Sequence, residues 1–281
     1  MAEVGCLKDG HFQNLEIGDN GILFQKSNIV DSSKVLFNTL LPKTSIFDYT
    51  PRTEFLDDFS MTLGTKTVSG HTDTTGKYSS GTTTYVATMT DGSAGSTQTI
   101  VLGGVGNTVF PGRGNRCTAF VTDADDDDSM ELQSIGDPFE VTDSTEFYME
   151  TRFKINSKLT TDLIIGLSAI DTDVITATDD GIYFILVDGG AGVVKATVEK
   201  SGTATASNSL GLMVDDTFKT FGMYKSTDGI ITLYVDGVKS AVTLANTNLP
   251  DDVPLVPTIA FQNGDGTAST LTLDYLYILN R

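Results

Sequence analysis

The chain has 281 residues, of which 37 are acidic and 18 are basic, so its formal net charge is −19 and its sequence pI is near 4.2. A chain of this length can form one large β domain or two small ones. Its acidity argues against binding to nucleic acid, which needs a basic surface to replace counterions around phosphates, and against docking on anionic membranes. The acidity is compatible with simple solubility, or with a basic or cation-bridged partner.

The N-terminal stretch MAEVGCLKDGHFQNLEIG lacks a basic segment followed by an apolar one, so we expect no secretory signal. No run approaches the roughly 18 apolar residues of a membrane span. Cys6 and Cys117 lie in separate segments and do not make a disulfide framework. We expect two free thiols in a protein made in reducing cytosol.

Residues 1–53 differ in pattern from the rest of the chain. Short apolar runs alternate with polar breaks, and neither a period of 2 nor one of 3.6 is sustained. This predicts an extended N-terminal arm with at most short strands. Part of the arm is too apolar for a solvated linker and is expected to dock on the chain's own domain or on a neighbouring subunit. The residues expected to make that contact are Val35, Leu36, Phe37, Leu40 and Leu41.

From residue 54 onwards the pattern is that of many short strands separated by turns rich in Gly, Ser and Asp. Strands are expected at 83–90, 97–102, 119–122, 130–135, 146–155, 162–170, 181–187, 193–200, 258–262 and 270–279. Short helical turns are expected at 210–214 and 251–253.

Residues 218–242 carry the clearest local pattern, three strand-like segments joined by two Asp-Gly turns. Asp and especially Gly tolerate the positive φ that hairpin turns require, so this stretch predicts a β-meander. No strand–helix–strand alternation occurs along the chain. The expected fold of residues 54–281 is therefore all-β, a two-sheet antiparallel sandwich.

Four stretches together resemble the concanavalin A-like jelly roll of lectins and glucanases, including its laminin-G-like relatives. They are FLDDF (55–59), FYMETRFKI (147–155), ITLYVDG (231–237) and LDYLYIL (273–279). The resemblance covers about residues 54–281 and implies that the first and last strands of the domain lie together. These motifs are structural, so they indicate a fold more than an activity.

Glucanases of this fold resemble one another in a strand bearing Glu-x-Asp-x-x-Glu, whose two working carboxyls need a separation of roughly 5.5 Å for a retaining mechanism. This chain has no such string. The nearest strand carries Glu146 and Glu150 without a central Asp, and a period of 2 places both on the presumed solvent face. We expect surface charges there and no enzymatic activity. The absence of Trp weakens a sugar site without excluding one, because Tyr can stack on sugars as well.

The segment at 123–129 gathers five carboxylates in seven residues, a composition that Ca²⁺ favours. It does not match an EF-hand, because Asp128 stands where Gly is needed and Ser134 where a bidentate Glu belongs. Two interpretations stay open. One is a solvated acidic loop, and the other is a structural Ca²⁺ site with Asp123, Asp125 and Asp127 as ligands. No other cofactor is expected.

The resemblance supports two functions. An arm followed by a concanavalin A-like domain resembles virion proteins of bacteriophages, which implies a non-enzymatic capsid decoration or cement protein. Such a protein would bind the major capsid protein and copies of itself, as a dimer or trimer, and would lie in the virion after synthesis in the host cytoplasm. The alternative is a glycan-binding, lectin-like module on a virion fibre or a cell surface. Neither function involves nucleic acid or a membrane.

Overall fold

The computed structural model describes residues 116–135 and 138–281 continuously, together with strands at 3–4, 14–18, 21–25, 53–57, 64–69, 76–80, 83–90 and 97–106. The chain divides into two compact units, Met1–Pro51 and Arg52–Arg281. The division after Pro51 falls close to the domain boundary expected after residue 53. The five apolar arm residues named as docking contacts, from Val35 to Leu41, lie outside the described residues, and that expectation stays a prediction.

The first unit contains a small antiparallel sheet in the order β1-β2-β3. Its strands are β1 (Glu3–Val4), β2 (Asn14–Gly18) and β3 (Gly21–Gln25). Gly18 pairs with Gly21 at the tight end of the β2–β3 hairpin. Short strands of this kind are what the interrupted apolar pattern of the arm predicted.

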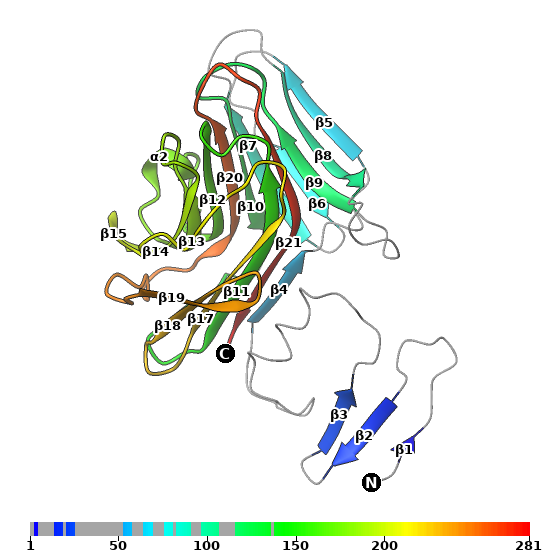
Figure 1. Cartoon of the computed structure of the whole chain (residues 1–281), viewed down its shortest axis with the longest axis vertical. Coiled ribbons are helices and arrows are strands. Elements are labelled where there is room, and N and C mark those ends of the chain that lie inside the picture. The colour runs from blue at the N-terminus through cyan, green and yellow to red at the C-terminus, as the bar shows by residue number, and fades with distance from the viewer. Residues whose placement is uncertain are drawn as a thin grey trace. The chain divides into compact units, whose positions relative to one another are not determined.

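The second unit is a sandwich of two antiparallel sheets that face each other, each with nine described strands (Figure 1). We call the first the β12 sheet, with the order β15-β14-β13-β12-β20-β10-β7-β6 and β16 paired to β14. Its strands are β6 (Gly76–Ser80), β7 (Thr83–Thr90), β10 (Ser129–Ile135), β12 (Thr161–Ser168), β13 (Gly181–Leu186), β14 (Val193–Lys200), β15 (Thr203–Ala206), β16 (Gly211–Leu212) and β20 (Val256–Asn263).

The second sheet, the β11 sheet, has the order β19-β18-β17-β11-β21-β9-β8-β5, with β4 paired to β21. Its strands are β4 (Thr53–Asp57), β5 (Gly64–Ser69), β8 (Thr97–Gly106), β9 (Arg116–Val121), β11 (Phe147–Ile155), β17 (Lys219–Lys225), β18 (Ile231–Val235), β19 (Val238–Leu244) and β21 (Thr270–Asn280).

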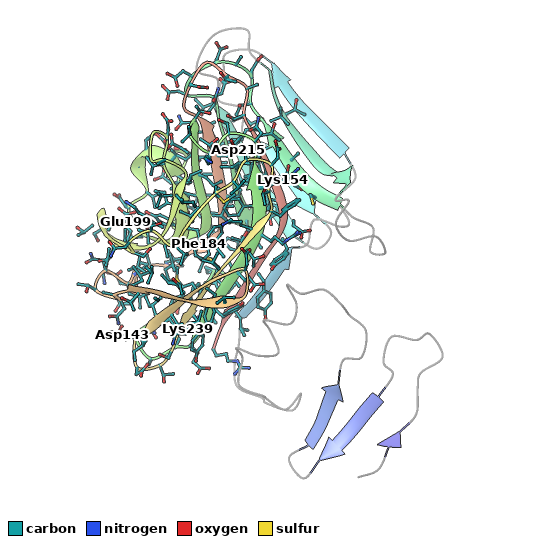
Figure 2. The ribbon with its side chains drawn as sticks, viewed as in Figure 1. Asp143, Lys154, Phe184, Glu199, Asp215 and Lys239 are labelled. Carbon is teal, nitrogen blue, oxygen red and sulfur yellow. The ribbon has the colours of Figure 1, made fainter. Side chains whose placement is uncertain are left out.

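The hydrophobic core lies between the two sheets and is built from alternate residues of their strands. Phe221 of β17 contacts Phe153 of β11, with ring centroids 5.5 Å apart, and Phe184 of β13 in the opposite sheet at 5.8 Å. Figure 2 labels Phe184 among the side chains of the sandwich. All three rings are fully buried, and each contributes about 1.5–3 kcal/mol through removal of its apolar surface from water. The contact between Phe221 and Phe184 joins the two sheets.

The predicted fold class, an all-β two-sheet antiparallel sandwich, is confirmed. The β17–β18–β19 meander is present, and Gly229 and Gly237 adopt positive φ values of 79° and 80° in its two turns. Strand β4 pairs with the closing strand β21, Phe55 opposite Ile278. The first and last strands of the sandwich therefore lie together, as the jelly-roll resemblance implied.

The predicted helical turns at 210–214 and 251–253 are wrong. Gly211–Leu212 forms strand β16, which pairs with β14 through Val193 and Val194, so the backbone bonds of this segment are made between strands. Within the described residues the helix is α2 (Val174–Ala177), whose N-cap Asp173 accepts a bond from the backbone N–H of Thr176. No helix in the described part of the chain is long and apolar enough to span a membrane.

Cys117 of β9 is a free thiol, fully buried, and its Sγ lies 3.8 Å from Oδ1 of Asp274. Burial, followed by the negative charge of Asp274, raises the pKa of the thiol to about 12. Because the thiolate is the reactive form, the native thiol should be inert.

We expect Cys117 to react with a disulfide reagent at pH 8 about 100-fold more slowly, or slower still, in the folded protein than in urea. The measurement is absorbance-monitored labelling of a Cys6→Ser variant, which leaves Cys117 as the sole thiol of the chain. Equal rates with and without urea would contradict the buried environment of this thiol.

Candidate functional site

The acidic loop between β9 and β10 is tied down by Asn263 at the end of β20. The side-chain Nδ2 of Asn263 donates to the carbonyl oxygens of Asp123, at 3.2 Å, and Asp125, at 2.8 Å. The backbone N–H of Asp127 donates to the carbonyl of Asn263 at 2.9 Å, and Asp127 has a φ of +66°. Hydrogen bonds within the protein therefore set the conformation of this loop.

The described residues contain no group of three or more His, Cys, Asp or Glu side chains placed to hold a metal ion. Ca²⁺ takes six to eight oxygen ligands, and the two carbonyls that the loop turns inward already accept bonds from Asn263. The Ca²⁺ interpretation of Asp123, Asp125 and Asp127 thus stays a prediction, without a converging ligand set in the described residues to support it.

Glu150 of β11 is fully buried, so the expectation that Glu146 and Glu150 are both surface charges is wrong for Glu150. Glu150 is 0% exposed, whereas the side chain of Glu146 is 27% exposed. Tyr148 and Arg152, which share the outward face of β11 with Glu150, are buried too. A period of 2 identifies residues that share a face, but it does not reveal whether that face is covered.

Both carboxylate oxygens of Glu150 accept hydrogen bonds from tyrosines. The Tyr148 hydroxyl donates to Oε2 at 2.6 Å, and the Tyr275 hydroxyl donates to Oε1 at 2.5 Å. Burial and the neighbouring Glu150 charge raise the pKa of Tyr148, which keeps its hydroxyl protonated as a donor. Glu146 accepts a bond from the Tyr224 hydroxyl at 2.9 Å. The carboxyls of this strand are therefore engaged in the fold.

The outer face of the β12 sheet carries a pocket of about 210 Å³. It lies where residues 170–172, which follow β12, meet strands β7, β10 and β20. Its aliphatic lining is Val86, Ile135, Ile170 and Val256, and its polar lining is Thr88, Glu131, Gln133, Ser134, Asp171 and Thr172. The neighbouring helix α2 packs on the same sheet through Val174, which clusters with Ile164, Tyr183 and Ala260.

Gln133 of β10 anchors the segment after β12 to the sheet. Its Nε2 donates to Oγ of Ser168 and to the carbonyl of Ala169, both at 3.0 Å, with Oγ1 of Thr258 at 3.4 Å. Its Oε1 accepts from the backbone N–H of Asp171 at 3.0 Å. The hydrogen-bonding groups of this amide are thus used within the protein, and they shape one wall of the pocket.

Glu131 of β10 lines the pocket and is only 4% exposed. Its Oε1 accepts from the backbone N–H of Val174 at 2.8 Å, whereas its Oε2 is buried without a hydrogen-bond partner in the described part of the chain. Burial, with smaller contributions from the charges of Asp173 and Asp171, raises the pKa of Glu131 to about 7. The backbone N–H groups of Val174 and Ile175 lower this pKa in part, and the carboxyl changes charge near neutral pH.

Reasoning from the sequence missed Glu131 and Gln133. They alternate with the core residues Met130 and Leu132, which is the pattern of an ordinary solvent-facing strand surface. The pocket arises because a segment 38 residues further along the chain, at Asp171, folds back over that surface. Nothing in the local sequence of β10, SMELQSI, predicts that another segment covers this face.

No family model matches the sequence, and no curated protein matches it. Among solved structures, a protein of unknown function from Shewanella oneidensis MR-1 is similar at 15% identity, over 91% of this chain and 96% of that chain, with a TM-score of 0.50. A Bacillus licheniformis β-glucanase matches at 13% identity, over 80% of this chain and 97% of that chain, with a TM-score of 0.44. The potassium-bound carbohydrate recognition domain of Emp46p matches at 13% identity, over 62% and 86%, with a TM-score of 0.43.

These likenesses concern the fold. The match with a TM-score of 0.50 is to a protein of unknown function, so the activity of this chain stays open.

Proposed function

We propose that this chain is a non-enzymatic structural protein of a virus particle, a decoration protein that docks on the capsid of a bacteriophage. The observation that supports the proposal is the division of the chain into the unit Met1–Pro51 and the sandwich Arg52–Arg281. A unit of this size buries a small share of its surface, so docking on another surface would stabilise it. A capsid supplies such a surface, and the sandwich then decorates it.

The state of the carboxyls on β11 supports a role without catalysis. A retaining hydrolase needs one carboxyl free to attack and another free to donate a proton. Glu150 is closed to solvent and bonded to two tyrosines, and Glu146 is bonded to Tyr224. The strand nearest in pattern to the catalytic strand of glucanases, which lacks the central Asp, thus uses its carboxyls to stabilise the sheet.

The proposal predicts that a gene for a major capsid protein lies near the gene for this chain. The test is a sedimentation assay with shells assembled from that capsid protein. We expect the full chain to pellet with the shells, whereas a variant lacking residues 1–53 stays in the supernatant. Circular dichroism should show that the shortened variant is folded. Pelleting of the shortened variant would contradict docking through the arm, and failure of the full chain to pellet would overturn the capsid role.

The glycan-binding alternative is favoured by one observation. Tyr224 of β17 is partly exposed on the outward face of the β11 sheet, and sugars commonly stack on aromatic rings. A glycan array at neutral pH with Ca²⁺ tests this alternative. Saturable binding that is lost in a Tyr224→Ala variant would replace the purely structural role with that of a lectin-like module.

A further inference from the structure

We propose that the Glu131 pocket binds the side chain of a lysine or arginine that a partner protein presents. The lining and the charge of the pocket indicate the chemistry of the ligand. Its assignment to the capsid rests on the function proposed above.

The first reason is the free oxygen of Glu131. Oε1 is held by the Val174 N–H, and the backbone N–H of Ile175 also acts on the carboxyl, but Oε2 is buried without a hydrogen bond of normal geometry among the described residues. Buried polar atoms in folded proteins almost always have a partner, so an exception points to a group that binds there. That group must be a donor when the carboxyl is ionised.

The second reason is charge. The two side chains whose charges act most on Glu131, Asp173 and Asp171, are both negative, and Asp171 lines the same pocket. The residues paired with Glu131 on the adjacent strands, Thr88 and Ala260, are uncharged. A cation in the pocket would relieve this repulsion, and the net charge of −19 would draw a basic partner towards the protein.

The third reason is the aliphatic wall. Four aliphatic side chains line the pocket, and two of them, Ile170 and Ile135, are exposed. Lysine and arginine cover apolar surface with their methylene stems while the charged end reaches a polar partner. A volume of about 210 Å³ is smaller than the usual pocket for a whole small-molecule ligand and suits one extended side chain.

The same lining argues against a sugar. None of the ten lining residues is aromatic, so a sugar ring has no face to stack on. The amide of Gln133, which would be a natural partner for sugar hydroxyls, is bonded to Ser168, Ala169 and Asp171. The remaining lining groups are carboxyls and aliphatic side chains, which suit a side chain with an apolar stem and a positively charged end.

The test is an NMR titration of the full chain with three blocked amino acids: Nα-acetyl-lysine methylamide, its arginine counterpart and the neutral norleucine counterpart. At pH 8 we expect the two cations to shift the amide signals of the pocket residues saturably, and norleucine to bind about tenfold more weakly or less. At pH 5.5 protonation of Glu131 should weaken the binding of the cations by about tenfold or more. Equal binding by norleucine would overturn the proposal, and so would the absence of any shift at the pocket, which would mean that water alone fills it.

Two pairs of variants locate the binding. Glu131→Gln removes the charge at constant shape and should abolish binding, whereas Asp126→Asn makes the same change of charge in the exposed acidic loop and should leave it intact. If the Gln variant does not fold, Ile170→Lys tests the rim instead. Ile170 is 77% exposed, so its replacement by a cation should weaken binding without loss of the fold, and Val238→Lys at a 70% exposed site is its control. Unchanged binding in Glu131→Gln and in Ile170→Lys would overturn the proposal.

The same variants separate this inference from the capsid role. A Glu131→Gln protein that no longer binds blocked lysine but still pellets with capsid shells would show that the pocket takes no part in docking, and the capsid role would survive. A protein that binds blocked lysine normally but never pellets with shells would leave the pocket inference intact and overturn the capsid role.

Discussion

Replacement of Lys225 by methionine is expected to destabilise the protein by about 3 kcal/mol or more, because four carbonyl groups, that of Ser226 at 3.4 Å among them, would lose a charged donor. Lys225 ends β17 and is only 1% exposed. Its Nζ donates to the carbonyl oxygens of Thr142, Asp143 and Thr145, each at 2.9 Å. The ammonium thus gathers the backbone of the turn that precedes β11 and joins that turn to the end of β17.

The measurement is the free energy of unfolding from urea titration, with Lys239→Met as the matched control. Lys239 lies exposed on β19, so the control removes the same charge without breaking a buried contact (Figure 2). The control should change the free energy of unfolding by about 0.5 kcal/mol or less. If the two variants unfold at the same urea concentration, the ammonium of Lys225 does not have the structural role assigned to it.

Replacement of Glu150 by alanine is expected to cost about 3 kcal/mol, because two buried tyrosine hydroxyls would lose their acceptor and a void would form. The hydroxyls are those of Tyr148 on the same strand and Tyr275 on β21, so the carboxylate links adjacent strands of the β11 sheet. A Glu150→Gln variant keeps the shape and one acceptor oxygen, and it should lose less stability.

The matched control is Glu146→Ala, at a carboxyl that is 27% exposed and bonded to Tyr224. A partly exposed group of this kind is expected to contribute about 1 kcal/mol or less. Urea titration of the three variants should rank the loss of stability as Glu150→Ala, then Glu150→Gln, then Glu146→Ala. A loss at Glu146 as large as that at Glu150 would contradict the difference in burial between the two carboxyls.

Local patterns predicted most of the strands. The expected strands at 83–90 and 193–200 coincide with β7 and β14, since alternation and turn residues act over a few neighbouring positions. The Asp-Gly pairs at 228–229 and 236–237 predicted the turns of the meander for the same reason. The two-sheet fold followed from the number of strands and the absence of helices.

Only the tertiary structure decided what covers each face. The sequence placed Glu150 on the outward face of β11, where it lies, but it is buried. Glu131 on the outward face of β10, which the sequence reasoning missed, is buried as well. Residues that follow β12 fold over Glu131, and a tyrosine of the closing strand, Tyr275, reaches Glu150 from 125 residues away. The pairing of 211–212 with β14, which replaced the expected helical turn, is likewise a contact between strands. Periodicity depends on neighbours in the sequence, so the sequence alone determined the strands. Burial depends on segments that only folding brings together, so the tertiary structure determined the pocket.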